Sequence, residues 1–341
     1  MKRLSLGVAL IVVAAAILLF SDTLVDATGQ RNRAHVTTPS IASKLWHVEL
    51  LGYVSTLDTE ESQRGWIDGL KKAGLVEGQD FQLKISNAQG DMATLNTLVD
   101  SAVARQADLL LTITTQALQA AVRGAKDTPV VFTMVANPIL AGVATSDNEH
   151  LPNITGAHGA NDADAMMPII RQLMPEARKL GALYAPAEAN SAYSHGLLVK
   201  AAAKAGYELV SLPISSPAEV HDASAAICAH GIDLICLPNS NLAGSCYPSI
   251  AKAARRAKLP VFGFLGTIAP QGAVVVLTRD YHAMAFDAGQ LAARVIRGES
   301  PANIPLHQVQ KNRLLVNPAA AKACGLTLPE SLIRSADEVV E

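Results

Sequence analysis

The feature that most limits the fold of this chain is a regular alternation of short apolar segments with helical segments. In the first half, the expected strands are His47–Val54, Phe81–Ser86, Leu109–Ile113 and Val130–Val135. The expected helices follow them: one from Asp58 or Thr59 to about Gly74, then Met92–Arg105 and Thr115–Gly124. Strands that alternate with helices of about 10–15 residues predict a parallel sheet with right-handed crossovers.

The same order returns in the second half of the chain. Its expected strands are Leu180–Tyr184, Glu208–Pro213, Ile232–Leu237 and Val261–Phe264. Its expected helices are Ser191–Gly206, Ala218–Ala229 and Ala243–Lys258. The segment Thr128–Phe132 also resembles Leu259–Phe262. We therefore predict two similar α/β lobes, although any two doubly wound domains share such patterns.

Length and composition agree with two soluble domains. The chain has 341 residues, of which 50% are hydrophobic and 17% are charged, enough for a sizeable core. The formal net charge is −2, so no basic excess exists to bind a nucleic-acid backbone. Only 4% of residues are aromatic, which argues against a stacking surface for single strands. We expect no nucleic-acid partner.

The N-terminus has the pattern of an export signal. Lys2 and Arg3 precede the uncharged apolar run Leu4–Phe20, and small residues at 25 and 27 permit cleavage after Ala27. We therefore predict a signal peptide over residues 1–27, followed by a flexible leader over residues 28–44. The alternative is an uncleaved N-terminal anchor, because the apolar run is near the lower limit for spanning a bilayer. Either way, the mature protein is expected in the periplasm or another extracytoplasmic compartment.

Polar residues gather in the loops that follow the predicted strands. Ligands of parallel α/β sheets bind outside the carboxyl ends of the strands, and a cleft between two such lobes is the expected site. In the second lobe these loops are Pro186–Ser191, Pro238–Asn241 and Gly263–Thr267, with Glu188 as the charged exception. Ser, Thr and Asn at helix N-termini can bind an anion such as a carboxylate, but each is also an ordinary helix cap.

Signatures of catalysis are mostly absent. The sequence contains no HExxH, GxSxG, P-loop or GxGxxG motif, and His195 and His282 lack metal-ligand spacing. We expect no enzyme activity, no cofactor and no metal.

Among the four cysteines, Cys228, Cys236 and Cys246 lie close together in the sequence. One expectation is a disulfide from Cys236 to Cys246 or to Cys228, and the other is free buried thiols.

Several segments together resemble a known family. The distinctive ones are Gly74–Asp80 (GLVEGQD), Asn153–Gly156 (NITG) and the C-terminal Ala336–Glu341 (ADEVVE). Further similar segments are Gly65–Leu70, Asn137-Pro138 with Gly142, Asp280-Tyr281 and Leu315–Asn317. As a set they resemble the substrate-binding proteins of ABC transporters, in the family that includes tryptophan- and tyrosine-binding members. The resemblance covers about residues 46–341.

The resemblance implies a type I periplasmic-binding fold, with two doubly wound parallel-sheet lobes joined by a three-stranded hinge. The hinge crossings would lie at Asn153–Gly159, Thr278–Tyr281 and near Asn312–Val316. The first lobe would then comprise residues 45–157 plus about 281–311. The second would comprise residues 158–280 plus about 312–341. Closure of such a hinge around a ligand reports occupancy to the permease.

The resemblance also suggests ligand-binding positions. They are Tyr53, Ser55, Thr56, Thr114, Thr115, Gln116, Asn137, Asn190, Ser191, Asn239, Ser240, Phe264 and Asp280. Asp280 would face a ligand ammonium, by its charge and its place at the hinge. Many relatives have Ser and then an acidic residue where this chain has Phe264-Leu265, so its cleft is expected to differ in what it recognises.

These observations predict a monomeric solute-binding protein that delivers an amino acid or related small organic acid to the permease subunits of an ABC importer. A ligand-sensing ectodomain on an uncleaved anchor is the alternative. An exported enzyme on the same scaffold is a weaker one, since fold alone does not determine function.

Overall fold

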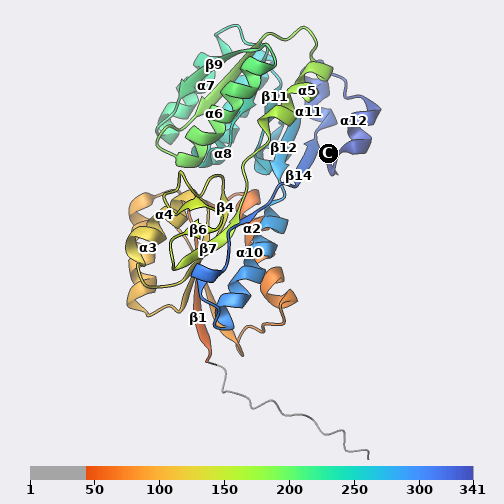
Figure 1. The fold of residues 1–341 in the computed structure, drawn as a ribbon. Coiled ribbons are helices and arrows are strands. Elements are labelled where there is room, and N and C mark those ends of the chain that lie inside the picture. The colour runs from red at the N-terminus through yellow and green to blue at the C-terminus, as the bar shows by residue number, and fades with distance from the viewer. Residues whose placement is uncertain (1–43, 341) are drawn as a thin grey trace, which may run out of the picture. The chain divides into compact units, whose positions relative to one another are not determined.

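The computed structural model describes residues 44–340. The predicted signal peptide and nearly all of the predicted leader lie outside the described residues. The described chain forms two lobes, each built on one large sheet (Figure 1). The predicted class, α/β with two doubly wound lobes, is confirmed.

The first lobe is built on a six-stranded sheet in the order β13-β7-β4-β3-β1-β2, with every neighbouring pair parallel. Its strands are β1 (Trp46–Gly52), β2 (Phe81–Asn87), β3 (Leu109–Ile113), β4 (Val130–Val135), β7 (Ile154–His158) and β13 (His307–Gln308). Its helices are α2 (Leu57–Lys72), α3 (Met92–Ala104), α4 (Thr115–Gly124), α10 (Tyr281–Ile296) and the 3-10 turn η2 (Pro301–Asn303). The small hairpin β5 (Ala144–Ser146) and β6 (Glu149–His150) stands apart from this sheet.

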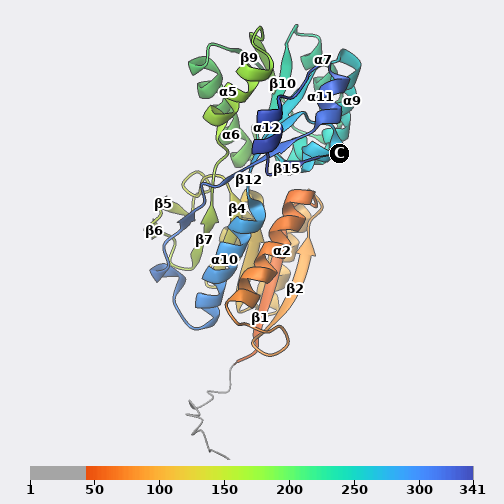
Figure 2. The ribbon, with the colours of Figure 1, turned by 90° about the vertical axis from the view of Figure 1, so that its right-hand side faces the viewer.

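Helices cover both faces of the first sheet. On one face, α2 and α10 lie side by side, and Trp66, Leu70 and Met284 are fully buried there (Figure 2). On the other face, α3 and α4 bury Leu95 and Leu118. Because α10 directly follows a strand of the second lobe, β12 (Val275–Arg279), the chain returns to complete the first core.

The second lobe is built on a seven-stranded sheet in the order β15-β14-β12-β11-β10-β8-β9. Its strands are β8 (Lys179–Tyr184), β9 (Glu208–Pro213), β10 (Leu234–Leu237), β11 (Val261–Gly263), β12 (Val275–Arg279), β14 (Asn312–Val316) and β15 (Glu338–Val339). Its helices are α5 (Ala163–Leu173), α6 (Ala189–Lys204), α7 (Pro217–Cys228), α8 (Asn241–Ser245), α9 (Tyr247–Ala257), the 3-10 turn η1 (Gly266–Gln271), α11 (Pro318–Ala323) and α12 (Glu330–Ser335). β12 and β14 are antiparallel, and the other pairs are parallel.

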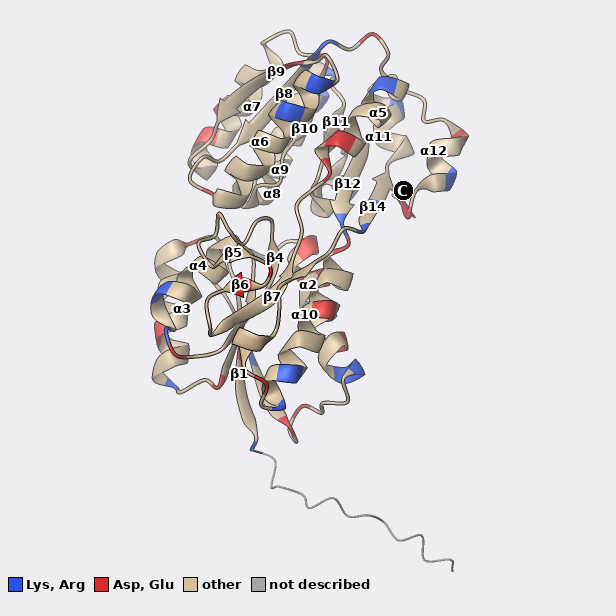
Figure 3. Ribbon diagram, in the orientation of Figure 1, with Lys and Arg blue, Asp and Glu red and all other residues tan. Residues whose placement is uncertain are grey.

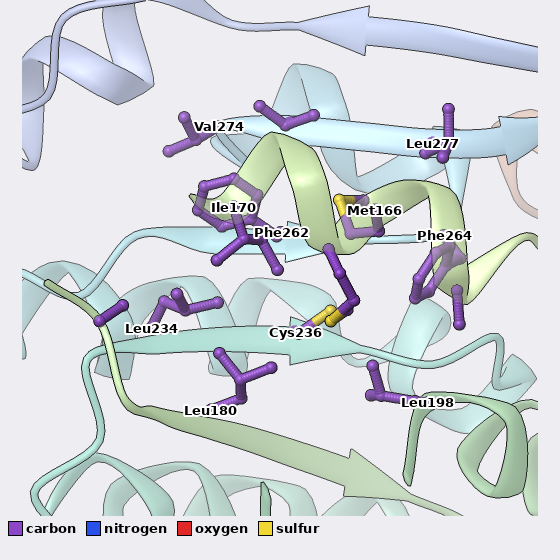
Figure 4. Close-up of a cluster of buried hydrophobic side chains, with 14 of the residues drawn as sticks. Met166, Ile170, Leu180, Leu198, Leu234, Cys236, Phe262, Phe264, Val274 and Leu277 are labelled. Carbon is purple, nitrogen blue, oxygen red and sulfur yellow. The ribbon is translucent and has the colours of Figure 1, made fainter. Parts of the chain in front are cut away.

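One core of the second lobe lies between the sheet and α5, where Met166, Cys236 and Phe262 meet (Figure 4). The opposite core, beneath α7 and α9, buries Tyr247 and Ile250. All four cysteines are free thiols, so the expectation of buried thiols describes Cys236 and that of a disulfide does not hold. Complete burial raises the pKa of the Cys236 thiol to about 12.

Two helices of the second lobe differ from the sequence prediction. The single helix expected over Ala243–Lys258 is broken at Cys246, which ends α8 and begins α9. Pro248 has no N–H to donate to the carbonyl four residues earlier, so it favours a new helix start there. The sequence analysis assigned no helix to Ala163–Leu173, where α5 contains Pro168.

The chain passes between the two sheets after β7, between β12 and α10, and between β13 and β14. Arg279 joins these three crossings. Its guanidinium donates to the carbonyl oxygens of Ala160 and Gln310 and, over 2.7 Å, to Oδ1 of Asn312. The lobe boundaries given above stay a prediction.

Charges of both signs lie on helices and loops of both lobes (Figure 3). Among the described helices, none is both long and apolar enough to cross a bilayer.

Candidate functional site

The N-terminus of α4 forms one wall of the space between the lobes. Thr114 caps the helix with φ of 91° and ψ of 158°, a conformation that β-branched residues rarely adopt. Such strain, of about 1–3 kcal/mol, collects at functional sites because the surrounding structure holds it there. Thr115 follows, 2% exposed, and its hydroxyl has no hydrogen-bond partner among the described residues. The first N–H groups of a helix lack intrahelical acceptors, and here the Ala117 N–H donates to the Thr114 hydroxyl over 3.5 Å.

Gln116 connects this wall to the second lobe. Its Nε2 donates to Oδ1 of Asn190 over 3.0 Å, and its Oε1 accepts from Nδ2 of Asn241 over 2.7 Å. All three side chains are at least nine-tenths buried. Because Asn190 lies in the first turn of α6 and Asn241 begins α8, the N-termini of three helices meet around one amide group.

Glu188 lies beside this amide network, at the N-terminus of α6. Its carboxylate caps α8 instead of its own helix. Oε2 accepts from the Ser240 hydroxyl over 2.8 Å and from the Asn241 N–H over 2.9 Å, and Oε1 accepts from the Leu242 N–H over 3.0 Å. Burial raises the pKa of this carboxyl above its usual value, although the three hydrogen bonds oppose the shift.

A cavity of about 310 Å³ opens at this place, between the two lobes. Its polar lining includes Tyr53, Gln116 and Glu188. Its apolar lining includes Val54, Met92, Ile214, Pro217 and Leu242. This volume is at the lower end of the range for small-molecule sites, so it suits a ligand of amino-acid size.

Asp58 forms a second contact between the lobes. It lies in the first turn of α2, and Oδ2 accepts from the Thr267 N–H of η1 over 3.3 Å. A side chain at Gly266 would overlap the other oxygen of Asp58, so glycine permits this close approach. Complete burial raises the pKa of Asp58 to about 7, with Glu61 raising it further and Arg313 opposing.

Of the thirteen predicted site residues, Tyr53 and Gln116 line this cavity and the other eleven do not, among them Asp280 and Phe264. Asp280 caps α10, accepting from the Ala283 N–H over 2.9 Å, and its other oxygen binds Nζ of Lys311 over 2.8 Å. Phe264 is 1% exposed and packs in the core of the second lobe beside Met166 (Figure 4). Their proposed contacts with a ligand stay predictions.

The other predicted residues hold the loops of the site in shape. Thr56 caps α2, and Asn137 accepts from the Leu140 N–H within its own turn. Asn239 donates to the Tyr281 hydroxyl over 2.7 Å, which joins the second lobe to α10. Two of the rest accept or donate within their own lobe: Ser191 Oγ accepts from the Ala185 N–H, and the Tyr53 hydroxyl donates to the Gly90 carbonyl. Ser240 donates to Glu188, as described above. Ser55 is exposed.

The sequence analysis placed Glu188 and Asn241 in loops and Asp58 at the start of a helix, but it assigned none of them a role at the site. Glu188 carried a usable signal, because it is the only charged residue in the three second-lobe loops given above. Asp58 carried a weaker one, since acidic residues are common in the first turn of any helix. The convergence of Asn241 on Gln116 depends on how the lobes face each other, so no local pattern predicts it.

A larger depression of about 620 Å³ lies on the first lobe, along β1 and β2. Its lining includes Glu49 and Arg105, which form an ion pair, and contains none of the predicted site residues. We place the site at the smaller cavity because the helix N-termini and the loops after the strands meet there. Within the described chain, no cluster of His, Cys, Asp or Glu could hold a metal ion.

Comparisons with known proteins agree with this geometry. The family model described as "ABC transporter substrate binding protein" matches residues 47–340. A tyrosine-binding protein of Clostridioides difficile (strain R20291) is 30% identical over 264 residues, covering 77% of this chain and 76% of the relative.

Two solved structures are similar in fold over 87% of the chain. One is an ABC domain from Streptococcus pneumoniae in complex with L-Trp, with 25% identity, full coverage of that chain and a TM-score of 0.83. The other is the ligand-free, open form of a substrate-binding protein with adhesive properties from Clostridium difficile, with 25% identity, 99% coverage and a TM-score of 0.67.

Proposed function

We propose that this chain, which belongs to the family of ABC transporter substrate-binding proteins, captures a small molecule between its lobes and delivers it to an ABC importer. The family is one of binding proteins and not of enzymes. The proposed ligand is an amino acid or a related small organic acid. Support comes from the tyrosine-binding relative and from the L-Trp bound to the structure of similar fold.

The observation that carries this proposal is the N-terminus of α4. Its positive end and its first N–H groups suit a carboxylate. The buried hydroxyl of Thr115 is an additional donor that lacks an acceptor in the described chain. Thr114 holds the strained backbone at the start of this helix. The apolar walls of the neighbouring cavity would then receive the side chain of the ligand.

Replacing Thr115 tests this site. We expect Thr115→Val to weaken binding of an amino acid by about tenfold, since a hydrogen bond to a charged group contributes about 1.5–3 kcal/mol. Thermal shifts with the twenty amino acids would identify a ligand, and calorimetry would give its affinity. Thr112→Val is the matched control, because the Thr112 hydroxyl in β3 is also buried without a partner among the described residues. Equal affinities for Thr115→Val and the unaltered protein would contradict the proposed site.

We also propose that the protein is exported by residues 1–27 and works as a monomer outside the cytoplasm. N-terminal sequencing of the protein from its membrane and soluble fractions tests this. A mature terminus near residue 28 supports a released delivery protein. An intact apolar segment in the membrane fraction would favour the anchored sensor instead.

A further inference from the structure

Among the described residues, the lining of the cavity between the lobes carries negative charge only. Of the described residues that line it, Glu188 is the only one with a charged side chain, and none is Lys, Arg or His. The three groups that donate to Glu188 are a hydroxyl and two backbone N–H groups, all neutral. The cavity therefore contains a negative charge that no cation in its lining balances.

The carboxylate of Glu188 can accept a further donor. Two ionised oxygens offer about four acceptor positions, and three are used. Oε1 accepts only from the Leu242 N–H, so it has the open position. The desolvation that raises the pKa of this carboxyl is the cost of keeping a charge buried without a cation. A cationic group in the cavity would offset that cost.

We propose that Glu188 binds a positively charged amine of the ligand, so that the cavity selects primary amines that also carry an apolar group. This inference rests on the proposed function and names the group by which the ligand is chosen. The apolar group would contact Met92, Ile214 and Leu242, which line the same cavity. A ligand carboxylate would bind at α4, because Glu188 already occupies the N–H groups at the start of α8.

A matched series of ligands tests the selection without any change to the protein. The probes are L-tyrosine, tyramine, which lacks the carboxylate, and 3-(4-hydroxyphenyl)propanoate, which lacks the amine. The inference predicts that loss of the amine weakens binding by about 30-fold or more, as loss of one partner of a buried charge pair does. Tyramine should bind better than the amine-free acid.

Equal or tighter binding of the amine-free acid would overturn the inference and leave the proposed function in place. Failure of both amines to bind would also overturn it, and the panel of amino acids would then decide the proposed function separately. The tryptophan series, with tryptamine and indole-3-propanoate, repeats the comparison with a larger ring.

A pair of variants identifies the residue that recognises the amine. We expect Glu188→Gln to remove the preference for the amine, while Glu219→Gln keeps it. Glu219 is a suitable control because it is exposed at the start of α7 and accepts from Ser215 at the cavity rim. Circular dichroism would confirm that each variant is folded. If a variant does not fold, the ligand series above still tests the inference, because it uses the unaltered protein.

Asp280→Asn is the rival variant, since Asp280 is the acidic residue that the sequence suggested for an ammonium. If Asp280→Asn lost the preference for the amine and Glu188→Gln kept it, the amine would bind at the hinge. That outcome would overturn the inference.

Discussion

A buried carboxyl group at the contact between two lobes is costly when ionised, and Asp58 is such a group. It accepts from the Thr267 N–H over 3.3 Å, and burial raises its pKa to about 7. In the unfolded chain the value would be near 3.8. The folded protein thus binds this proton more tightly than the unfolded chain does. The stability that the protonated Asp58 carboxyl contributes to the folded protein is complete below about pH 4. It is lost as the pH rises towards about 7.

We therefore expect Asp58→Asn to reduce the dependence of stability on pH. The free energy of unfolding of the unaltered protein should fall relative to that of the variant by up to about 1.4 kcal/mol per pH unit in this window. Urea unfolding of both proteins at about pH 5 and about pH 8 measures the difference between their free energies of unfolding. The titration of the other carboxyl groups is the same in both proteins and cancels in this difference. A constant difference at the two pH values would show that Asp58 is ionised throughout.

At the scale of elements, the close packing of α2 against α10 depends on glycines. Gly69 faces Gly289, and a Cβ on Gly69 would lie 2.9 Å from the Gly289 Cα and overlap the Phe286 carbonyl oxygen. Gly65 meets the same helix near His282. The sequence analysis used Gly65–Leu70 only as part of a family resemblance, and the structure gives the physical reason for its glycines.

Gly69→Ala should destabilise the first lobe by about 1–3 kcal/mol, because the helices must separate to make room. Gly196→Ala in α6 is the matched control. Its new Cβ would have nothing within 4 Å, so better helix propensity should stabilise the protein by about 0.5–1 kcal/mol. Chemical unfolding of the two variants should give shifts of opposite sign. A stabilised Gly69→Ala protein would contradict the packing described here.

At the scale of the whole described chain, a few polar contacts join the lobes. Arg313 of β14 binds both oxygens of Glu61 in α2, over 3.0 and 3.1 Å. Both side chains are about three-quarters buried. The Gln116 network and the Asp58 contact add to this pair. Since these contacts need the lobes to be close, each should favour ligand binding by favouring closure.

Glu61→Gln should therefore weaken ligand affinity by about threefold to tenfold, in keeping with about 1 kcal/mol for a partly buried ion pair. Glu330→Gln is the control, because Glu330 pairs with Arg334 within α12 alone. Calorimetry with the amino acid that binds best would measure the affinities, and small-angle scattering would follow compaction on binding. Unchanged affinity in Glu61→Gln would mean that the pair contributes nothing to closure.

The amino-acid sequence by itself determined the fold class, most strands and most helices of both lobes. Hydrophobic periodicity and caps act within a few residues, so they can be read locally, as the correct bounds of Leu109–Ile113 and Val130–Val135 show. It also placed Gln116 and Asn190 in loops that meet between the lobes. Local rules failed where proline interrupts a helical pattern, at α5 and between α8 and α9.

Only the tertiary structure decided which polar groups meet and which charges remain unbalanced. Asp280 and Glu188 are both acidic residues at helix N-termini, and their local sequence does not show which of them a cation neutralises. In the fold, Lys311 neutralises the first, while the second lies in a cavity whose described lining has no cation. The pairing of charges depends on segments far apart in the chain, so it follows from the packing of the lobes and not from local sequence.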